Sequence, residues 1–328
     1  MRHVIALDVG GTSMKAALVS PDGAVLHEAR QPTGRHRGAD AVVGAVLGFA
    51  DELRVRGEAR YGLPPLAVGL AVPGIIDADR GIAVYAANLG WRDVPLRELL
   101  TERLDGVPVA LGHDVRAGGL AEGRLGAGRG AERFLFVPLG TGIAGAIGID
   151  GAIEAGANGS AGEIGHIVVR PGTAGAPCGC GQRGCLETLA SAAAVSRAWA
   201  EAGGGADADA ADCAKAVASG DPRAVRVWQE AVDALADGLV TALTLLDPGT
   251  LIIGGGLAEA GETLFSPLRE AVRSRITFQR PPAIVPAALG DSAGCLGAGL
   301  LAWDLVTTGT ASTTGAASTS NTTTEVTA

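Results

Sequence analysis

Two stretches of the chain repeat the same order of elements: an apolar strand, a turn rich in glycine and threonine, a returning strand and a hairpin. The first stretch covers residues 3–29, with its glycine turn at 10–13. The second covers residues 134–151, with its glycine turn at 140–142 and an Asp-Gly pair at its hairpin. Glycine and Asp-Gly pairs are strong turn signals because they tolerate positive φ. The repeat therefore predicts a duplicated domain that folds into two related lobes.

Helices and strands are expected to alternate through the rest of the chain. The expected helices cover 39–57, 95–104, 115–125, 224–246, 262–275 and 293–305, and the further strands cover 66–72, 107–111, 251–253 and 283–288. This alternation is typical of the α/β class, in which helices cover the faces of a sheet. From Thr307 to Ala328 the chain has almost no apolar anchor, which predicts a disordered tail over 307–328.

The composition excludes several classes of protein. Hydrophobic residues make up 47% of the chain and the net charge is −9, which argues against nucleic acid or an anionic membrane surface as a partner. No unbroken apolar run is long enough to cross a membrane, and we expect no signal peptide. Three of the five cysteines lie in one short loop, so we expect a cytoplasmic protein rather than a disulfide framework.

That loop gathers thiols, an imidazole and two carboxylates. The candidate metal ligands are His166, Cys178, Cys180 and Cys185. Three thiolates and one imidazole form a tetrahedral set for a structural zinc ion. Free thiols in a flexible loop and a buried core histidine are the alternatives. The carboxylates Glu163 and Glu187 lie among the ligands, so a zinc ion here would also fix their positions.

Three glycine turns each follow an apolar strand. They are Asp8 with Gly10, Gly11 and Thr12; Gly140, Thr141 and Gly142; and Gly254, Gly255 and Gly256. Glycine lets backbone amides approach a phosphate closely, and a carboxylate such as Asp8 is a ligand suited to Mg²⁺. Each turn alone is an ordinary turn, and none matches a P-loop or a dinucleotide fingerprint. Together they predict a nucleotide bound between the two lobes.

Two further polar residues are candidates for the site. Asp114 follows the strand at 107–111 and precedes a helix of small and apolar residues. An aspartate there is either an N-cap or a general base facing a cleft, and both roles are compatible. Asn88 lies in a loop and is either a hydrogen-bonding group for a ligand or a turn residue.

With these motifs the chain resembles the ROK family of sugar kinases, a branch of the duplicated actin-like (ribonuclease-H-like) ATPase fold, over about residues 4–305. Asp8 to Thr12 with Lys15 looks like the family's first phosphate motif, the turn at 140–142 like the second, and the turn at 254–256 like the adenosine-side turn. The segments 162–166 and 178–187 are similar to the family's zinc and sugar signature.

The resemblance implies two lobes around a nucleotide and sugar cleft. The small lobe would cover 1–112 and be joined by the helix at 293–306, and the large lobe would cover 113–292 with the zinc loop at 162–187. It also implies transfer of phosphate from ATP with Mg²⁺ to the 6-hydroxyl of a hexose. On this basis Asp114 is the base, and the sugar is bound by Asn88, His113, Asp114, Glu163, His166 and Glu187. A homodimer is expected because dimers are frequent in the family.

Two departures from the family pattern bear on the sugar. His113-Asp114 replaces the usual Asn-Asp, and Arg116 stands where a second asparagine is common. Leu186 stands where many glucokinases of the family carry an aromatic residue. A smaller residue at 186 would accommodate a 2-acetamido group, which favours N-acetylglucosamine, with glucose as the alternative.

Other members of the family have other roles. Some are repressors with a winged-helix domain before the kinase fold, but here the phosphate motif starts at Asp8 and the charge is acidic. A sugar sensor without catalysis is disfavoured because Asp8 and Asp114 are retained. A polyphosphate donor is disfavoured because the sequence shows no basic track to hold a polyanion.

Overall fold

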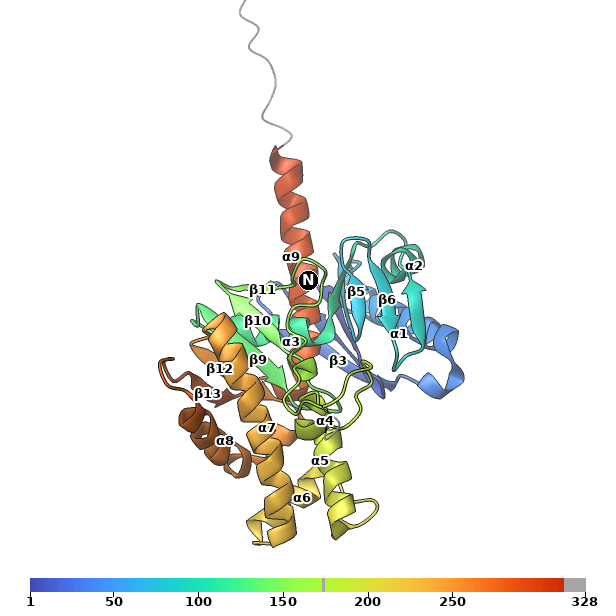
Figure 1. The fold of residues 1–328 in the computed structure, drawn as a ribbon. Coiled ribbons are helices and arrows are strands. Elements are labelled where there is room, and N and C mark those ends of the chain that lie inside the picture. The colour runs from blue at the N-terminus through green and yellow to red at the C-terminus, as the bar shows by residue number, and fades with distance from the viewer. Residues whose placement is uncertain (173–174, 316–328) are drawn as a thin grey trace, which may run out of the picture. The chain divides into compact units, whose positions relative to one another are not determined.

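The computed structural model describes residues 1–172 and 175–315, in which the chain divides into two compact units. Unit 1 consists of Met1–Asp114 together with the chain from Cys295 onward, and unit 2 consists of Val115–Gly294. Figure 1 colours the chain from blue at the N-terminus to red at the C-terminus and labels many of the helices and strands of both units. Each unit is built around its own five-stranded sheet, and each is described separately below.

The sheet of unit 1 has the strand order β3-β2-β1-β4-β8. Its strands are β1 (Val4–Val9), β2 (Ser13–Val19), β3 (Val25–Pro32), β4 (Val68–Val72) and β8 (Val109–His113). The first three strands form an antiparallel meander, whereas β4 and β8 run parallel to β1. Every residue of β4 is buried, as expected for a central parallel strand with both faces covered.

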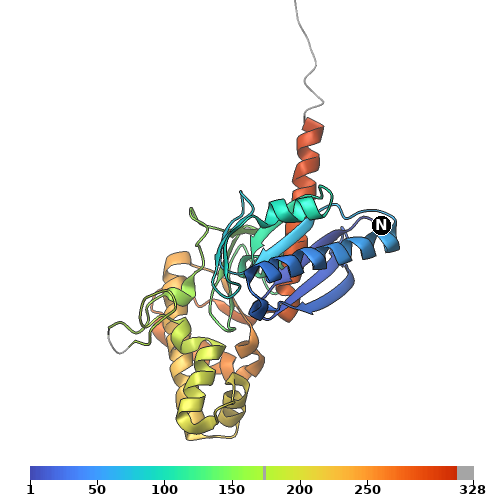
Figure 2. The ribbon, with the colours of Figure 1, turned by 90° about the vertical axis from the view of Figure 1, so that its right-hand side faces the viewer.

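Helix α1 (Ala39–Tyr61) packs on this sheet through Val42, Val46, Phe49 and Leu53, which follow the 3.6-residue helical period and are buried. Figure 2 shows α1 lying across the strands of unit 1. The other elements of unit 1 are α2 (Leu96–Arg103), a small sheet of β5 (Ile75–Asp77), β6 (Ile82–Ala86) and β7 (Trp91–Val94), and the long helix α9 (Ala293–Gly315).

Unit 2 repeats the topology of unit 1. Its sheet has the order β11-β10-β9-β12-β13, with the same pattern of antiparallel and parallel neighbours. The strands are β9 (Arg133–Pro138), β10 (Ala146–Ile149), β11 (Ala152–Glu154), β12 (Thr250–Gly254) and β13 (Ala283–Pro286). Asp150 and Gly151 both have positive φ, 49° and 80°, as a two-residue type I′ hairpin requires. The duplication predicted from the sequence is confirmed.

The helices of unit 2 form the rest of its core. They are α3 (Asp114–Leu125), α4 (Glu187–Ala190), α5 (Ala192–Trp199), α6 (Ala210–Ala218), α7 (Pro222–Leu246) and α8 (Glu262–Arg275). Helix α7 begins with the N-cap Asp221 and with proline in its first turn, and it ends at Asp247 in the left-handed conformation. Its buried face, which includes Trp228, Leu235 and Leu239, packs against α6 and α8.

The structure extends the last helix beyond the predicted boundary. Helix α9 continues past residue 306 to Gly315, and the hydroxyls of Thr307 and Thr308 donate to the carbonyls of Trp303 and Asp304, both at 2.9 Å. These bonds satisfy hydroxyls that would otherwise compete with the helix. The remainder of the predicted disordered tail, 316–328, lies outside the described residues. Among the described helices, none combines the length and apolar character needed to cross a bilayer.

Candidate active site

In unit 1, the first glycine turn leaves β1 at the carboxyl edge of the sheet. Asp8 lies near the end of β1, and the Nζ atom of Lys15 on β2 is 3.9 Å from its Oδ2 atom. The amide of Gly10 donates to the carbonyl of Ser13 (3.0 Å), and the hydroxyl of Thr33 donates to the carbonyl of Gly10 (2.6 Å). The turn therefore has a fixed shape, with a carboxylate and an ammonium group beside it.

Asn88 lies against this same turn. A Cβ atom placed on Gly11 would be 3.3 Å from the Nδ2 atom of Asn88. Asn88 is held in the short connection between β6 and β7, in the small sheet that the sequence did not predict. The structure thus brings an amide predicted to bind sugar next to a turn predicted to bind phosphate, within one unit.

Asp114 is located at the same edge of the unit 1 sheet. Strands β1, β4 and β8 run parallel, so their carboxyl ends lie at one edge, and Asp114 follows β8 directly as the first residue of α3. The side chain of Asp114 is 29% exposed, whereas that of His113 is buried, with its Nδ1 atom 3.4 Å from Oδ1 of Asp114. The positive end of the α3 dipole favours a carboxylate at this position. Asp114 therefore combines a fixed position with access to solvent.

In unit 2, the second and third glycine turns lie together. The amide of Leu139 donates to the carbonyl of Gly254 (2.8 Å), and the amide of Leu257 donates back to the carbonyl of Leu139 (3.1 Å). Gly255, with a φ of 78°, packs against the backbone of Leu139. Next to this turn is a cavity of about 290 Å³, lined by Ala210, Ala214, Trp228, Gly256, Leu257 and Thr263. The two turns and the cavity offer backbone amides beside an apolar recess.

The segment 162–166 packs closely against residues 143–145, which directly follow the glycine turn at 140–142. The amide of Gly145 donates to the carbonyl of Gly162 at 2.6 Å, and Gly162 has a φ of 92°. A Cβ atom on Gly162 would collide with the carbonyl of Gly145, and one on Gly165 would collide with the carbonyl of Ile143. Glycine is therefore required at both positions, and the segment holds Glu163 at the surface of the unit.

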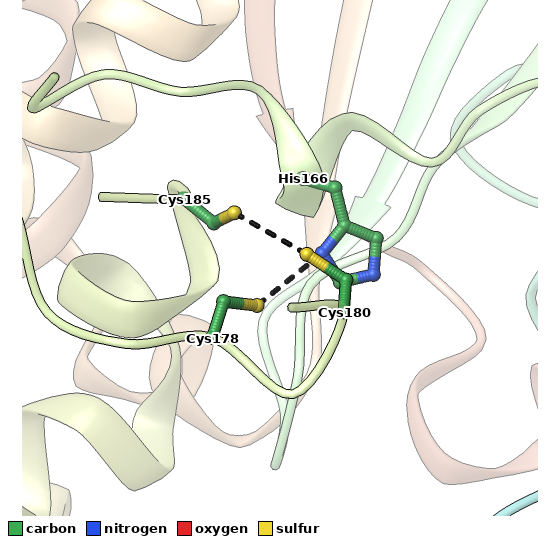
Figure 3. A group of neighbouring side chains, drawn as sticks. All are labelled: His166, Cys178, Cys180 and Cys185. Carbon is green, nitrogen blue, oxygen red and sulfur yellow. Dashed lines mark hydrogen bonds between the residues drawn. The ribbon is translucent and has the colours of Figure 1, made fainter. Parts of the chain in front are cut away.

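The structure gathers His166, Cys178, Cys180 and Cys185, whose ligand atoms all lie within 4.8 Å of one another. Figure 3 shows the three sulfur atoms and the Nδ1 atom of His166 pointing toward a common centre. The Sγ atom of Cys178 is 3.6 Å from Nδ1 of His166, and the Sγ atoms of Cys180 and Cys185 are 3.7 Å apart. The sequence predicted this grouping, and the structure confirms that the four side chains meet.

The chemistry and spacing of this donor set fit zinc. In a tetrahedral site with Zn–S bonds of about 2.3 Å, the sulfur atoms lie about 3.8 Å apart, close to the separation of Cys180 and Cys185.

Burial raises the pKa of the Cys178 thiol to about 12 and also raises that of Cys185. A hydrogen bond from the backbone of Gln182 lowers the pKa of Cys180. The Nε2 atom of His166 points away from the cluster.

Glu187 connects this cluster to the second glycine turn. Its Oε1 atom accepts from the thiol of Cys178 at 3.3 Å and lies 3.7 Å from Nδ1 of His166. Its Oε2 atom accepts from the amide of Ile143 at 3.4 Å. Thr141, Cys178 and Glu187 line one cavity of about 760 Å³. One carboxylate thus touches both the cysteine cluster and the predicted phosphate turn.

Two arginines that the sequence did not assign to a structural role hold the loops of the site. Arg116 donates from Nη1 to the carbonyl of Gly159 at 2.8 Å, and so holds the loop that leads to Glu163. Arg170, at the start of the cysteine loop, donates to Asp237 on α7 at 2.8 Å, and Arg275 on α8 donates to the other oxygen of Asp237 at 2.8 Å.

Asp237 is an electrostatic anchor for that loop. Its partial burial raises the pKa, but the hydrogen bonds from Arg170 and Arg275 outweigh burial and hold the pKa below its ordinary value. No sequence motif marks this network, because its members are far apart in the chain. A single sequence allows only the general expectation that arginine and aspartate pair across helices.

Leu186 occupies a different position from the one that the sugar prediction assumed. Its side chain is fully buried in the core of unit 2. It packs against Gly238 on α7, where a Cβ atom would lie 2.6 Å from Cδ2 of Leu186. A side chain enclosed in this way offers no surface to a substituent of a bound sugar. The predicted tolerance of a 2-acetamido group would therefore not arise from direct contact with Leu186.

A profile of the ROK family matches residues 4–304 of the chain. The glucokinase of Halalkalibacterium halodurans is 35% identical over 317 residues, which cover 92% of this chain and 94% of that protein. The crystal structure of a ROK hexokinase from Thermus thermophilus superimposes with a TM-score of 0.81 at 35% identity, and covers 93% of this chain and 99% of that one.

A second solved structure is that of a ROK glucokinase from Streptomyces griseus in complex with glucose and AMPPNP. The two structures superimpose with a TM-score of 0.78 at 32% identity, and the match covers 92% of this chain and 99% of the glucokinase chain. The chain therefore belongs to the ROK family. It is an ATP-dependent sugar kinase with a mixed-sheet α/β fold consistent with that of the actin-like ATPases.

Proposed function

We propose that this kinase phosphorylates the 6-hydroxyl of a gluco-configured hexose, with glucose as its preferred substrate. The observation that carries this proposal is the arrangement within unit 1. Asp114 lies at the sheet edge from which the Gly10 turn also leaves, and Asn88 lies against Gly11 in that turn. The proposed base therefore lies at the same sheet edge as the proposed phosphate-binding turn, and the proposed sugar-binding amide lies against that turn, an arrangement that suits phosphoryl transfer.

In the proposed mechanism Asp114 accepts the proton of the sugar hydroxyl and orients it for attack. Its partial exposure gives a substrate access to it, and its place at the head of α3 fixes it. Asp8 is the carboxylate suited to Mg²⁺, which would neutralise charge that develops on the phosphates. Lys15, 3.9 Å from Asp8, adds positive charge beside the same turn. Catalysis would then consist chiefly of positioning and electrostatic stabilisation.

The sugar would be held by hydrogen bonds from Asn88, His113, Glu163, His166 and Glu187. A zinc ion bound by Cys178, Cys180, Cys185 and Nδ1 of His166 would fix the ring, which leaves Nε2 to bond a hydroxyl. Glu187 would be held by the amide of Ile143, which donates to its Oε2 atom. The zinc would act through position alone, since its four ligands complete a closed structural site.

Glucose is favoured over N-acetylglucosamine for two reasons. Two of the similar proteins reported above are glucokinases, and one of these was solved in complex with glucose. The feature that favoured a 2-acetamido group was a small residue at position 186, and Leu186 is enclosed in the core. His113 remains as a residue that would affect the choice, because its ring adjoins Asp114. N-acetylglucosamine is therefore the second candidate.

The test is a coupled measurement of ADP formation with glucose, N-acetylglucosamine, N-acetylmannosamine, mannose and fructose. We expect the highest kcat/KM with glucose, and no turnover with 6-deoxyglucose, which lacks the accepting hydroxyl. A higher kcat/KM with N-acetylglucosamine would reverse the proposed preference. Binding of a sugar without any ADP formation would support a sensor instead, and competition between ATP and polyphosphate identifies the donor.

A further inference from the structure

A buried carboxylate outside the proposed substrate site connects two distant segments of the chain. Glu122, in the third turn of α3, is fully buried. Its Oε2 atom accepts from the amides of Ala127 (2.8 Å) and Ala288 (3.1 Å), and its Oε1 atom accepts from the amide of Leu289 (2.8 Å). All four residues belong to unit 2, and the bonds to 288 and 289 span more than 160 positions in sequence.

The chemistry of this contact is specific for a carboxylate. Within the described part of the chain, the partners of Glu122 are backbone amides rather than a lysine or arginine. A carboxylate accepts only, so its two oxygens match three N–H donors. Hydrogen bonds to a carboxylate are stronger than those between neutral groups, and they offset the cost of removing it from water. An amide or an apolar side chain of the same size would leave backbone donors unsatisfied.

These bonds lie close to the two points at which the chain passes between unit 1 and unit 2. The chain passes from unit 1 to unit 2 between Asp114 and Val115, in the first turn of α3, and returns between Gly294 and Cys295, in the first turn of α9. Glu122 lies two turns after the first crossing. Leu289 lies five residues before the second, next to the short 3-10 helix η5 (Gly290–Ser292). The carboxylate thus fastens together the two segments by which unit 2 is connected to unit 1.

The same segment also adjoins the third glycine turn. The amide of Ala287 donates to the carbonyl of Ile253 at 2.9 Å, and a Cβ atom on Gly254 would lie 3.1 Å from Cβ of Ala287. Glu122 therefore links the helix that begins at Asp114 to a segment seated on the turn predicted to bind the nucleotide. This connection runs entirely through backbone hydrogen bonds and one side chain.

We propose that Glu122 is a positioning residue for phosphoryl transfer. Within unit 2 it holds α3 at a fixed spacing from the segment at 287–289, and so fixes the helix whose first residue is Asp114. This inference rests on the proposed role of Asp114 as the base. Misplacement of a reacting group by about 1 Å lowers a rate by roughly 100-fold, so a small shift in this spacing has a measurable effect.

The test compares Glu122→Gln with wild type and with Glu270→Gln, a control on α8 where the glutamate is 73% exposed. The glutamine keeps the size of the side chain but presents an NH₂ group to amides that also donate. We expect kcat, calculated per mole of protein that binds sugar, to fall roughly 10- to 100-fold. The sugar Kd, measured by calorimetry without ATP, should stay within about twofold, because the proposed sugar-binding residues are unchanged. Glu122→Asp, which keeps the charge, should recover part of kcat.

Hydrogen exchange gives a readout that does not depend on turnover. In Glu122→Gln the amides of Ala288 and Leu289 should exchange faster than in wild type, whichever sugar the enzyme uses. A wild-type enzyme that turns over no hexose would overturn the proposed function, while faster exchange in the variant would still support the anchoring by Glu122. Unchanged kcat per binding site in Glu122→Gln, with only a lower melting temperature, would reduce Glu122 to a structural role. If Glu122→Gln does not fold, the same measurements on Glu122→Asp decide between these outcomes.

Discussion

The Cα atom of Gly165 lies so close to the carbonyl oxygen of Ile143 that a Cβ atom has no room between them. Gly162 has the same relationship with Gly145, and it also accepts the amide of Gly145 at 2.6 Å. The segment that carries Glu163 and His166 is therefore seated directly on the second glycine turn. Within unit 2, the backbone that follows the predicted phosphate turn therefore helps to fix the position of the segment with Glu163 and His166.

This contact predicts that Gly165→Ala impairs both stability and catalysis. The added methyl group must displace the backbone of one segment, which costs about 1–3 kcal/mol in a well-packed site. We expect a lower free energy of unfolding, measured by urea denaturation, and a higher KM for the sugar. Gly249→Ala is a matched control, because its nearest neighbour would be 3.8 Å away. Equal stability of the two variants would contradict the close contact.

The cysteine cluster predicts a zinc-dependent loop. Cys180→Ser removes a ligand from the set of four, so the zinc content should fall from about one ion per chain toward zero. The KM for the sugar should rise with it, because His166 and Glu187 both contact the cluster. Cys213→Ala, which alters a cysteine in α6 outside the cluster, is the control and should keep its metal. Metal analysis of the intact protein that finds no zinc would refute this prediction.

The sequence predicted those parts of the fold that depend on local patterns. Apolar runs followed by glycine turns indicated β1, β9 and β12, and the Asp-Gly pair at Asp150 indicated a hairpin whose φ values agree. The strands β5 to β7 were missed because segments of three to five residues contain too few alternating positions to be recognised. Helices α4 and α5, of four and eight residues, were missed because segments this short contain too few helical turns to show a period.

In the candidate site too, some features were predictable from local sequence and others depend on tertiary packing. The cysteines are close in sequence, so their grouping was predictable from spacing alone. The burial of Leu186 against Gly238 depends on how α7 packs, and the bonds from Glu122 to Leu289 connect residues far apart in the chain. Such contacts depend on tertiary structure, and the sequence of one segment carries no trace of its partner. The sugar preference inferred from Leu186 assumed an accessible side chain, and its burial could not be read from the local sequence.

The ion pairs of Asp237 predict how stability varies with pH. The pKa of Asp237 is lower in the folded state than in the unfolded state, where an ordinary aspartate has a pKa of about 3.9. As the pH falls, the unfolded state therefore binds more protons than the folded state does. The stabilisation is therefore complete above about pH 5 and is lost as the pH falls through the folded-state pKa.

Asp237→Asn should accordingly be less stable than wild type at neutral pH, and the difference should shrink in acid. Urea denaturation at a series of pH values measures this convergence. Glu270→Gln is the control, and the partner of Glu270, Arg273, is 69% exposed. Its stability should match that of wild type at every pH, because exposed ion pairs contribute little to stability. If the difference in free energy of unfolding between wild type and Asp237→Asn stays constant with pH, the charge of Asp237 is not the cause of the lower stability.

The role of Asp114 gives the most direct prediction about catalysis. Asp114→Asn keeps the size of the side chain at the head of α3 but cannot accept the hydroxyl proton. A positioned base contributes about 10²- to 10⁴-fold to a rate, so we expect a loss of kcat in this range, with the Kd for the sugar nearly unchanged. His113→Asn, at the buried neighbour 3.4 Å away, is the companion variant and should change KM and sugar preference more than kcat. Turnover at the wild-type rate in Asp114→Asn would exclude Asp114 as the base, and the oriented hydroxyl would then lose its proton to solvent.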